Sequence, residues 1–100
     1  MPIKLLLTYD IVPGQEQNYF EFVVREFVPG LQKLGMTPTE AWYTTYGDRP
    51  QFLTGAVADD LKSMKDALSS EAWDELEDGL LAFATNFSRR VVPNRSRFQM

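Results

Sequence analysis

The sequence predicts an α+β fold, and the order of its periodicities carries that prediction. Strand-like alternation, helical spacing and strand-rich composition follow one another along 100 residues. The predicted segments are a strand at 3–11, a helix at 15–34, strands at 37–46 and 51–58, a helical region from 59 to Phe87, and a last strand from Arg90. This β-α-β-β-α-β order is the split βαβ, or ferredoxin-like, layout with a four-stranded antiparallel sheet. We therefore expect one domain over residues 1–100.

The first strand is predicted by strict alternation. One face carries only apolar or aromatic side chains, namely Ile3, Leu5, Leu7, Tyr9 and Ile11. A period of two residues with one apolar face is typical of a strand packed against a core. Pro13-Gly14 then ends the strand as a turn pair.

The first helix carries one apolar stripe and one proline, which disturbs helical hydrogen bonding. The stripe recurs at steps of three and four residues through Phe20, Val23, Val24, Phe27, Leu31 and Leu34. Pro29 removes the hydrogen bond to the carbonyl of Arg25, so we expect one kinked helix or two short ones. Gly35 is placed to close the helix in the left-handed conformation.

Two strands joined by a tight turn are predicted next. Residues 37–46 are rich in β-branched and aromatic side chains, which strands favour. The segment Gly47-Asp48-Arg49-Pro50 predicts a turn, and residues 51–58 complete the hairpin. Gly55 within the second strand indicates a bulge or a close approach of two backbones.

The second helical region has two parts. Asp59-Asp60 indicates the first helix start, and Ser69-Ser70 interrupts and restarts the helix. The second part is predicted to bury Trp73, Leu76, Leu80, Phe83, Ala84 and Phe87, with Gly79 on the opposite side. Pro93 limits the last strand to an edge of the sheet or forces a bulge there.

The charge distribution argues against nucleic acid as a partner. Residues 1–88 hold six basic and fourteen acidic side chains, whereas residues 89–100 hold four arginines and no acid. Binding to phosphates requires a broad basic surface, which four arginines on an acidic body do not provide. We expect these arginines to lie on an edge strand, where they pair with the acidic helix or discourage aggregation.

The residue types that are missing exclude several chemistries. The chain has no cysteine and no histidine, which removes thiol nucleophiles, serine–histidine triads and histidine-ligated metal or haem. No spacing suggests an all-carboxylate metal site, so we expect neither metal nor cofactor. The sequence runs from Met1 directly into a strand, and no apolar run reaches about 18 residues. We therefore expect a cytoplasmic protein without a membrane span.

The predicted sheet has a second face that the helices leave open. On the hairpin Trp42, Thr44 and Tyr46 alternate with residues 41, 43 and 45, so large aromatic side chains occur on both faces. An exposed patch of this kind exceeds what a monomer usually shows. We expect a symmetric homodimer packed sheet to sheet; the alternative is a monomer whose threonines and tyrosines are solvated.

Three segments resemble, in order and over essentially the whole chain, those of the dimeric α/β barrel superfamily. Tyr9-Asp10-Ile11-Val12-Pro13-Gly14 resembles the strand end and Pro-Gly opening of the first helix. Trp42-Tyr43-Thr44-Thr45-Tyr46-Gly47 resembles the second strand, and Ser70-Glu71-Ala72-Trp73 resembles the start of the last helix. Within the superfamily the chain is most similar to NIPSNAP-like proteins, with the antibiotic-biosynthesis-monooxygenase-like branch next.

The resemblance implies a ferredoxin-like subunit that dimerises through its sheets and holds a small pocket between sheet and helices. Catalytic members often place a histidine in that pocket, and this chain has none. The monooxygenase-like branch uses an asparagine with a tryptophan, but Asn18 and Asn86 lie on no decisive motif here. Activity is therefore an open question from the sequence.

Five side chains are the candidates for lining such a pocket. They are Tyr9, Trp42, Thr44, Tyr46 and Trp73. The alternative for the four strand residues is a hydrogen-bonded sheet interface, and for Trp73 it is packing in the core. A shift of one residue in register would exchange Trp42 for Tyr43.

Three functions follow from these observations. The first is an uncharacterised NIPSNAP-like protein that binds a small hydrophobic or aromatic molecule between sheet and helices. The second is a cofactor-independent monooxygenase or isomerase acting on a hydrophobic substrate. The third is a protein-interaction module that uses the open sheet face.

Overall fold

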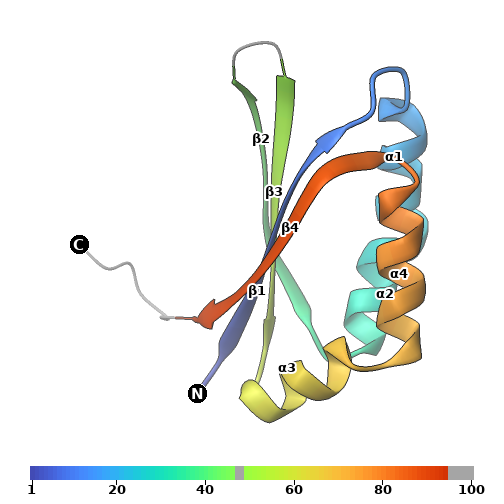
Figure 1. Ribbon diagram of the computed structural model, residues 1–100. Helices are drawn as coiled ribbons and strands as arrows, with labels where there is room; N and C mark the ends of the chain where they lie inside the picture. Colours follow the sequence, from blue (N-terminus) through green and yellow to red (C-terminus); the bar gives the residue numbers. More distant parts are fainter. Residues whose placement is uncertain (47–48, 95–100) are drawn as a thin grey trace.

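Four strands form one antiparallel sheet in the order β2-β3-β1-β4, which confirms the predicted ferredoxin-like α+β fold (Figure 1). The strands are β1 (Ile3–Ile11), β2 (Thr37–Tyr46), β3 (Arg49–Ala58) and β4 (Ala84–Pro93). The computed structural model describes residues 1–46 and 49–94; the side chains at positions 40 and 42–50 lie outside the described part. Residues 47–48 of the turn predicted at 47–50, and the last arginines, at 95 and 97, lie outside the described part. Residues 49 and 50 were predicted as part of that turn but begin β3 instead.

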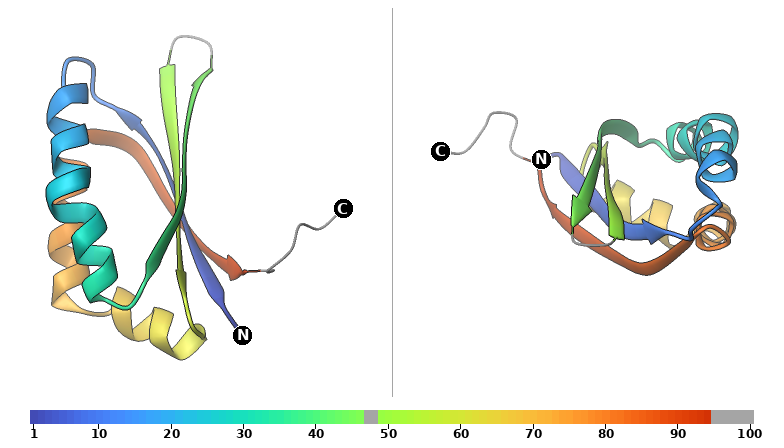
Figure 2. Two further views of the ribbon diagram at one scale, coloured as in Figure 1. Left: turned by 180° about the vertical axis from the view of Figure 1, so that it is seen from behind. Right: turned by 90° about the horizontal axis from the view of Figure 1, so that it is seen from above.

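All described helices lie on one face of the sheet or at its end. They are α1 (Glu16–Phe22), the π-helix η1 (Val23–Phe27), α2 (Val28–Lys33), α3 (Leu61–Leu68) and α4 (Glu71–Leu81). The continuous rod α1-η1-α2 runs beside α4, and α3 crosses the end of the sheet near the N-terminus (Figures 1 and 2). Among the described residues no helix is both long and apolar enough to cross a lipid bilayer.

The register of the strands decides which side chains form the core. The apolar face of β1 is buried along its whole length, as the alternation predicts. Cα pairing places Leu5 opposite Ala56, Leu7 opposite Thr54 and Tyr9 opposite Phe52. These rows face the helices, where Phe27, Leu31 and Trp73 complete a single core.

The predicted stripe of the first helix is wrong at its N-terminal half. Phe20 is 50% exposed and Val24 is 72% exposed, whereas Tyr19 and Phe22 are buried. The π-helix explains the difference, because its i→i+5 bonding inserts one residue into the helical repeat. The buried positions therefore step by three, five and four residues through Tyr19, Phe22, Phe27 and Leu31.

Pro29 and Gly35 behave as local chemistry dictates. Pro29 occupies the first turn of α2, immediately after the π-helix, so one continuous rod accommodates it. Gly35 has φ +86°, and its N–H donates to the carbonyl of Gln32 at 3.0 Å. The N–H of Met36 donates to the carbonyl of Leu31 at 2.9 Å, which completes a Schellman cap.

The second helix of the last region ends earlier than predicted. It stops at Leu81, and residues from Ala84 onward pair with β1 instead of continuing the helix to Phe87. The segment Thr85-Asn86-Phe87-Ser88 has poor helix propensity, and pairing with β1 satisfies its backbone groups. Asn86 takes φ +54° at a bulge in β4 opposite Tyr9.

The helix starts of α3 and α4 are capped as predicted. Gly79, however, does not lie on the solvent side of α4, where it was expected. The side chain of Asp60 accepts from the N–H of Ser63, and that of Ser70 accepts from the N–H of Trp73. Gly79 faces the first helix, and a Cβ there would lie 2.7 Å from the ring of Phe22. The absence of a side chain lets the two helices approach closely.

The edge-strand prediction for β4 is confirmed. β4 is the outer strand next to β1, and Pro93 is its last residue. The guanidinium of Arg89 lies 3.5 Å from Oε1 of Glu77 on α4, which is the expected pairing with the acidic helix. The bulge expected from Gly55 is found across from it, in β2 between Pro38 and Glu40.

Candidate functional site

A cavity of about 300 Å³ lies between the helix-covered face of the sheet and the rod α1-η1-α2. Its walls are mostly apolar. The lining residues are Tyr9, Tyr19, Val23, Phe27, Val28, Leu31, Pro38, Thr39, Ala41 and Thr54. Thr39 and Ala41, on the edge strand β2, are exposed, so the cavity opens beside that strand. Its volume is at the small end of the range for ligand pockets.

Three hydroxyl groups meet in the wall of this cavity. The hydroxyl of Tyr9 lies 2.5 Å from that of Tyr19 and 3.0 Å from Oγ1 of Thr54. Tyr9 comes from the middle of the sheet, Thr54 from the neighbouring strand and Tyr19 from the helix. One small polar cluster is therefore set into an otherwise apolar surface.

Burial controls the ionisation of the two tyrosines. Removal from water raises the pKa of Tyr9 above its ordinary value of 10.0, and hydrogen bonds from its neighbours offset only part of that effect. Burial also raises the pKa of Tyr19, and the adjacent Tyr9 raises it further. Both phenols are therefore protonated at neutral pH and can donate hydrogen bonds.

Backbone irregularities occur in two elements that line the cavity and in a third, β4, that pairs with the strand of Tyr9. The π-helix contributes Val23 and Phe27 to its wall. The bulge of β2 falls at Thr39, which lies at the mouth, and the bulge of β4 lies opposite Tyr9. π-Helical turns and β-bulges are both frequent at functional sites, where they redirect side chains.

The five predicted site residues differ in where they lie relative to the cavity. Tyr9 is fully buried and lines the cavity. Trp73 is also buried but does not line it: its ring packs 6.3 Å from that of Phe27, and its Nε1 donates to Glu77 at 3.1 Å. The side chains of Trp42, Thr44 and Tyr46 lie outside the described residues.

The backbone register still places the positions on β2. Position 43 pairs with Phe52, which pairs with Tyr9. Trp42 pairs with Leu53, which pairs with Thr8. The row that contains Tyr9 therefore reaches position 43 on β2, and the neighbouring row reaches position 42.

Two side chains that line the candidate site escaped the sequence analysis. Tyr19 was missed because a regular helical repeat assigns its face to solvent, and only the π-helix turns it inward. Thr54 was missed because no pattern in β3 marks its face. Once the register is known, the pairing of Leu7 with Thr54 shows that Thr54 lies in a row that faces the helices.

The two asparagines noted in the sequence lie elsewhere. Asn18 is exposed and donates to Oε1 of Gln15 at 3.0 Å. Asn86 donates to Oδ2 of the buried Asp10 at 2.7 Å, next to the β4 bulge. Within the described ranges, no three acidic side chains lie close enough together to hold a metal ion.

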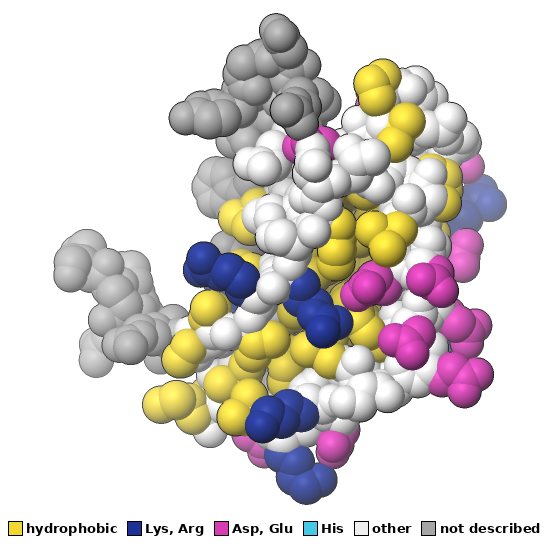
Figure 3. Space-filling model, viewed as in Figure 1, with side chains coloured by type: hydrophobic (Ala, Val, Ile, Leu, Met, Phe, Trp, Pro, Cys, Tyr) yellow, Lys and Arg dark blue, Asp and Glu magenta, His cyan; other side chains and the backbone are white. Residues whose placement is uncertain are grey.

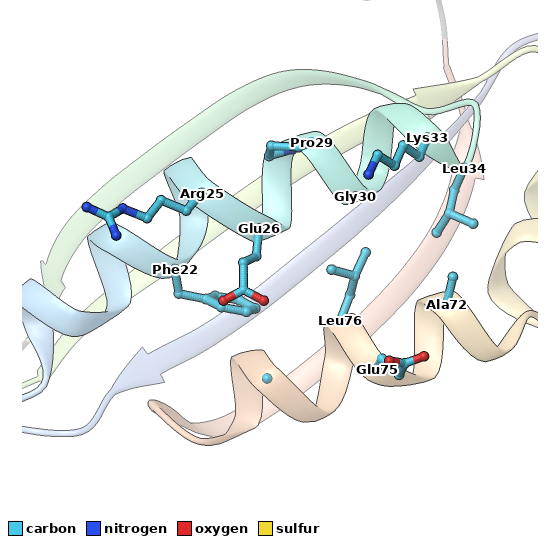
Figure 4. A pocket seen from close by; sticks show the side chains of 11 residues that line it. Phe22, Arg25, Glu26, Pro29, Gly30, Lys33, Leu34, Ala72, Glu75 and Leu76 are labelled. Carbon is cyan, nitrogen blue, oxygen red and sulfur yellow. The ribbon is translucent and has the colours of Figure 1, made fainter.

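A larger hollow of about 470 Å³ lies on the outside of the helical layer (Figure 4). It is a groove between the rod and α4, floored by Phe22 and Leu76 and bordered by exposed charges such as Glu26 and Glu75. It contains no buried polar cluster that would orient a ligand. We therefore regard the smaller cavity as the candidate site.

Fold and cavity together define a ferredoxin-like α+β protein with a small, largely apolar cavity under its first helix. No protein-family model matches the sequence, and no curated protein matches it either. Solved structures, however, share the fold over nearly the whole chain.

Three of these structures are informative. A NIPSNAP family protein from Agrobacterium tumefaciens matches with a TM-score of 0.72 at 16% identity, covering 96% of this chain and 95% of that one. A NIPSNAP-like domain protein from Burkholderia xenovorans matches with a TM-score of 0.70 at 15% identity, covering 99% and 90%. SnoaB, a cofactor-independent oxygenase from Streptomyces nogalater, matches with a TM-score of 0.70 at 14% identity, covering 99% and 98%. The resemblance expected from the sequence is thus confirmed for the fold.

Proposed function

We propose that this protein binds a small hydrophobic or aromatic molecule in the cavity between sheet and helices. One observation carries the proposal: three hydroxyls converge in an apolar cavity that opens beside β2. Apolar walls supply binding free energy, and a few placed polar groups fix the orientation of a ligand. A cytoplasmic location, expected from the sequence, stays a prediction.

The main alternative is catalysis, since SnoaB is a cofactor-independent oxygenase with this fold. Proton abstraction at neutral pH is most efficient with a base whose pKa is near 7. Burial moves the pKa of Tyr9 and Tyr19 in the opposite direction, and the described cavity lining includes no carboxylate or amine. We therefore favour ligand binding over catalysis as the function of the cavity.

Filling the cavity tests the proposal. Ala41→Phe would place a ring at the exposed mouth, while Val24→Phe adds the same ring on the outer surface of the rod and serves as the control. The probe is 1-tetralone, a two-ring aromatic ketone. At ten times its Kd we expect it to stabilise the wild type and the control by about 1.4 kcal/mol.

Isothermal titration and thermal unfolding supply the measurement. Loss of binding in Ala41→Phe alone would support the cavity as the site. Equal affinity of the two variants, or no binding to the wild type, would contradict the proposal. Mass spectrometry of the same mixture in air separates binding from turnover, because an oxidised or isomerised product would favour the catalytic alternative.

We also propose that two copies pack through the open sheet face. Leu6, Leu53, Val57 and Val92 are only half-buried, and their register positions alternate with those of the core row. Figure 3 shows hydrophobic side chains gathered around the N-terminal end of β1 and the adjoining end of β4. A second copy would remove this surface from water. If the face binds a different chain instead, the isolated protein will be a monomer.

A further inference from the structure

We propose that the groove between the rod and α4 binds an amphipathic helix of a partner protein whose polar face is rich in lysine or arginine. The groove lies on the outside of the helical layer, whereas the candidate cavity lies beneath the rod. The two surfaces are separate, so docking in the groove does not depend on the proposed function.

The floor of the groove is apolar and long enough for a helix to lie along it. Phe22, Leu34 and Leu76 point into the space between the rod and α4 (Figure 4). Leu34 and Leu76 are only half-buried, so part of this floor meets water. The eleven residues of α4 extend over about 16 Å. A groove of this kind accepts apolar side chains that recur at every third or fourth position of a docked helix.

Packing between the two helices holds the floor in place. The ring of Phe22 lies against Gly79, and the side chain of Leu76 lies against Gly30, in the space that a Cβ would occupy. The floor is therefore formed before a partner arrives. A preformed surface lowers the entropic cost of binding.

The wall that α4 contributes is negatively charged. Glu75 lines the groove, and Glu71 and Asp78 follow the same flank of the helix at steps of four and three residues. All three side chains are exposed, and Figure 3 shows acidic side chains gathered over α4. α4 contains no lysine or arginine. Within the described part of the chain none of the three carboxylates forms an ion pair, so all of them can pair with a partner.

The wall that the rod contributes has mixed charge. Arg25, Glu26 and Lys33 line it, and among the described residues none of them forms an ion pair with Glu75 across the groove. The preference for a cationic partner therefore comes from α4. A docked helix would direct lysine or arginine toward α4 and lay their aliphatic stems over the floor. Complementary charge also steers the two proteins together.

Two designed peptides test the docking of a basic helix on the full-length protein. Each has about 18 residues, because shorter helices are marginal in water. Leucines recur at every third or fourth position, and the flanking positions carry lysine in one peptide and glutamate in the other. We expect the lysine peptide to bind at least about tenfold more tightly than the glutamate peptide. Added salt should weaken its binding, because salt screens exposed charges.

A matched pair of charge variants tests the wall of α4. The double variant Glu75→Gln, Asp78→Asn should bind the lysine peptide about fivefold more weakly than the wild type, through the loss of two exposed charge pairs. The control Glu16→Gln, Asp59→Asn removes the same charge from exposed positions outside the groove lining and should bind like the wild type.

A second matched pair blocks the groove itself. Ala72 lines the groove and is exposed, so Ala72→Arg adds both bulk and a like charge where the peptide would lie. We expect this variant to lose detectable binding. Ala82→Arg adds the same side chain at the exposed end of α4, outside the groove lining, and should retain binding. Thermal unfolding checks that both variants fold.

Backbone amide chemical shifts of the labelled protein locate the bound peptide. The largest changes should fall on the rod and α4, and changes confined to the open sheet face would overturn the inference. Failure of the wild type to bind the lysine peptide, equal affinity for both peptides, or an equal loss in the control variants would also overturn it. A change in oligomeric state on Ala72→Arg would assign the groove to a second copy of this chain instead of a basic partner.

Discussion

Tyr9 and Tyr19 join two consecutive elements, β1 and α1, through one pair of hydroxyls. Their raised pKa values make a prediction about alkaline stability. The unfolded chain loses these protons near the ordinary pKa of 10.0, whereas the folded protein retains them. Their contribution is therefore complete below pH 10 and declines as the pH rises above that value.

Urea unfolding at several pH values, combined with phenolate absorbance, measures this effect. The decline above pH 10 should be smaller in the double variant Tyr9→Phe, Tyr19→Phe than in the wild type. Of the four tyrosines in the chain, two should ionise only when the protein unfolds. Ionisation of all four near pH 10 in the folded protein would contradict the prediction.

Trp73 is a predicted site residue whose surroundings favour the alternative of packing in the core. Its indole is buried beside Phe27, and Glu77 accepts its N–H while also meeting Arg89. We expect Trp73→Phe to lower the free energy of unfolding by about 1–2 kcal/mol, through lost packing and a lost hydrogen bond. The Kd of this variant for 1-tetralone should equal that of the wild type, and a large change in Kd would support Trp73 as a ligand-binding residue.

At the scale of elements, the close contact between the rod and α4 depends on two glycines. A Cβ at Gly79 would lie 2.7 Å from Phe22, and one at Gly30 would lie 2.7 Å from Leu76. We predict that Gly79→Ala destabilises the protein by about 1 kcal/mol, since overpacking costs roughly 1–3 kcal/mol and helix propensity returns about 1. Chemical denaturation measures it.

Phe22→Leu provides the matched background for that test. A smaller side chain at position 22 makes room for the added methyl group, so Gly79→Ala should be neutral or stabilising there. The same loss in both backgrounds would show that contact with Phe22 is not the cause.

The cap of α4 gives a second prediction for an element. The hydroxyl of Ser70 accepts from the N–H of Trp73 at 3.1 Å and donates to the carbonyl of Ala67 at 2.6 Å. Ser70→Ala should cost about 1 kcal/mol of unfolding free energy. Ser70→Asp restores a capping oxygen and should recover most of that loss, which thermal unfolding can determine; equal stability of all three proteins would argue against the cap.

For the whole molecule, the open sheet face predicts the oligomeric state. Light scattering after size-exclusion chromatography should show a dimer at micromolar concentration. Leu6→Lys places a charge on the open face and should give a monomer, because an unpaired charge in a packed interface is unfavourable. Val24→Lys, on the exposed surface of the rod, should leave the dimer intact. A wild-type monomer would contradict the dimer and favour an interaction module.

The sequence alone was sufficient for the order of elements, the face of β1, the caps at Asp60, Ser70 and Gly35, and the edge position of β4. These features depend on neighbours a few residues apart, so local periodicity and local hydrogen bonding encode them. The fold followed because that order admits few arrangements of an antiparallel sheet with helices on one face.

Only the tertiary structure decided which side chains line the candidate site. Tyr19 turns inward only because a π-helix shifts the helical repeat, and Phe87 joins a strand because β1 offers backbone partners. Thr54 reaches Tyr9, 45 positions away in the sequence, through the register between β1 and β3. Local patterns cannot specify such contacts, since their free energy arises only when distant segments pack together.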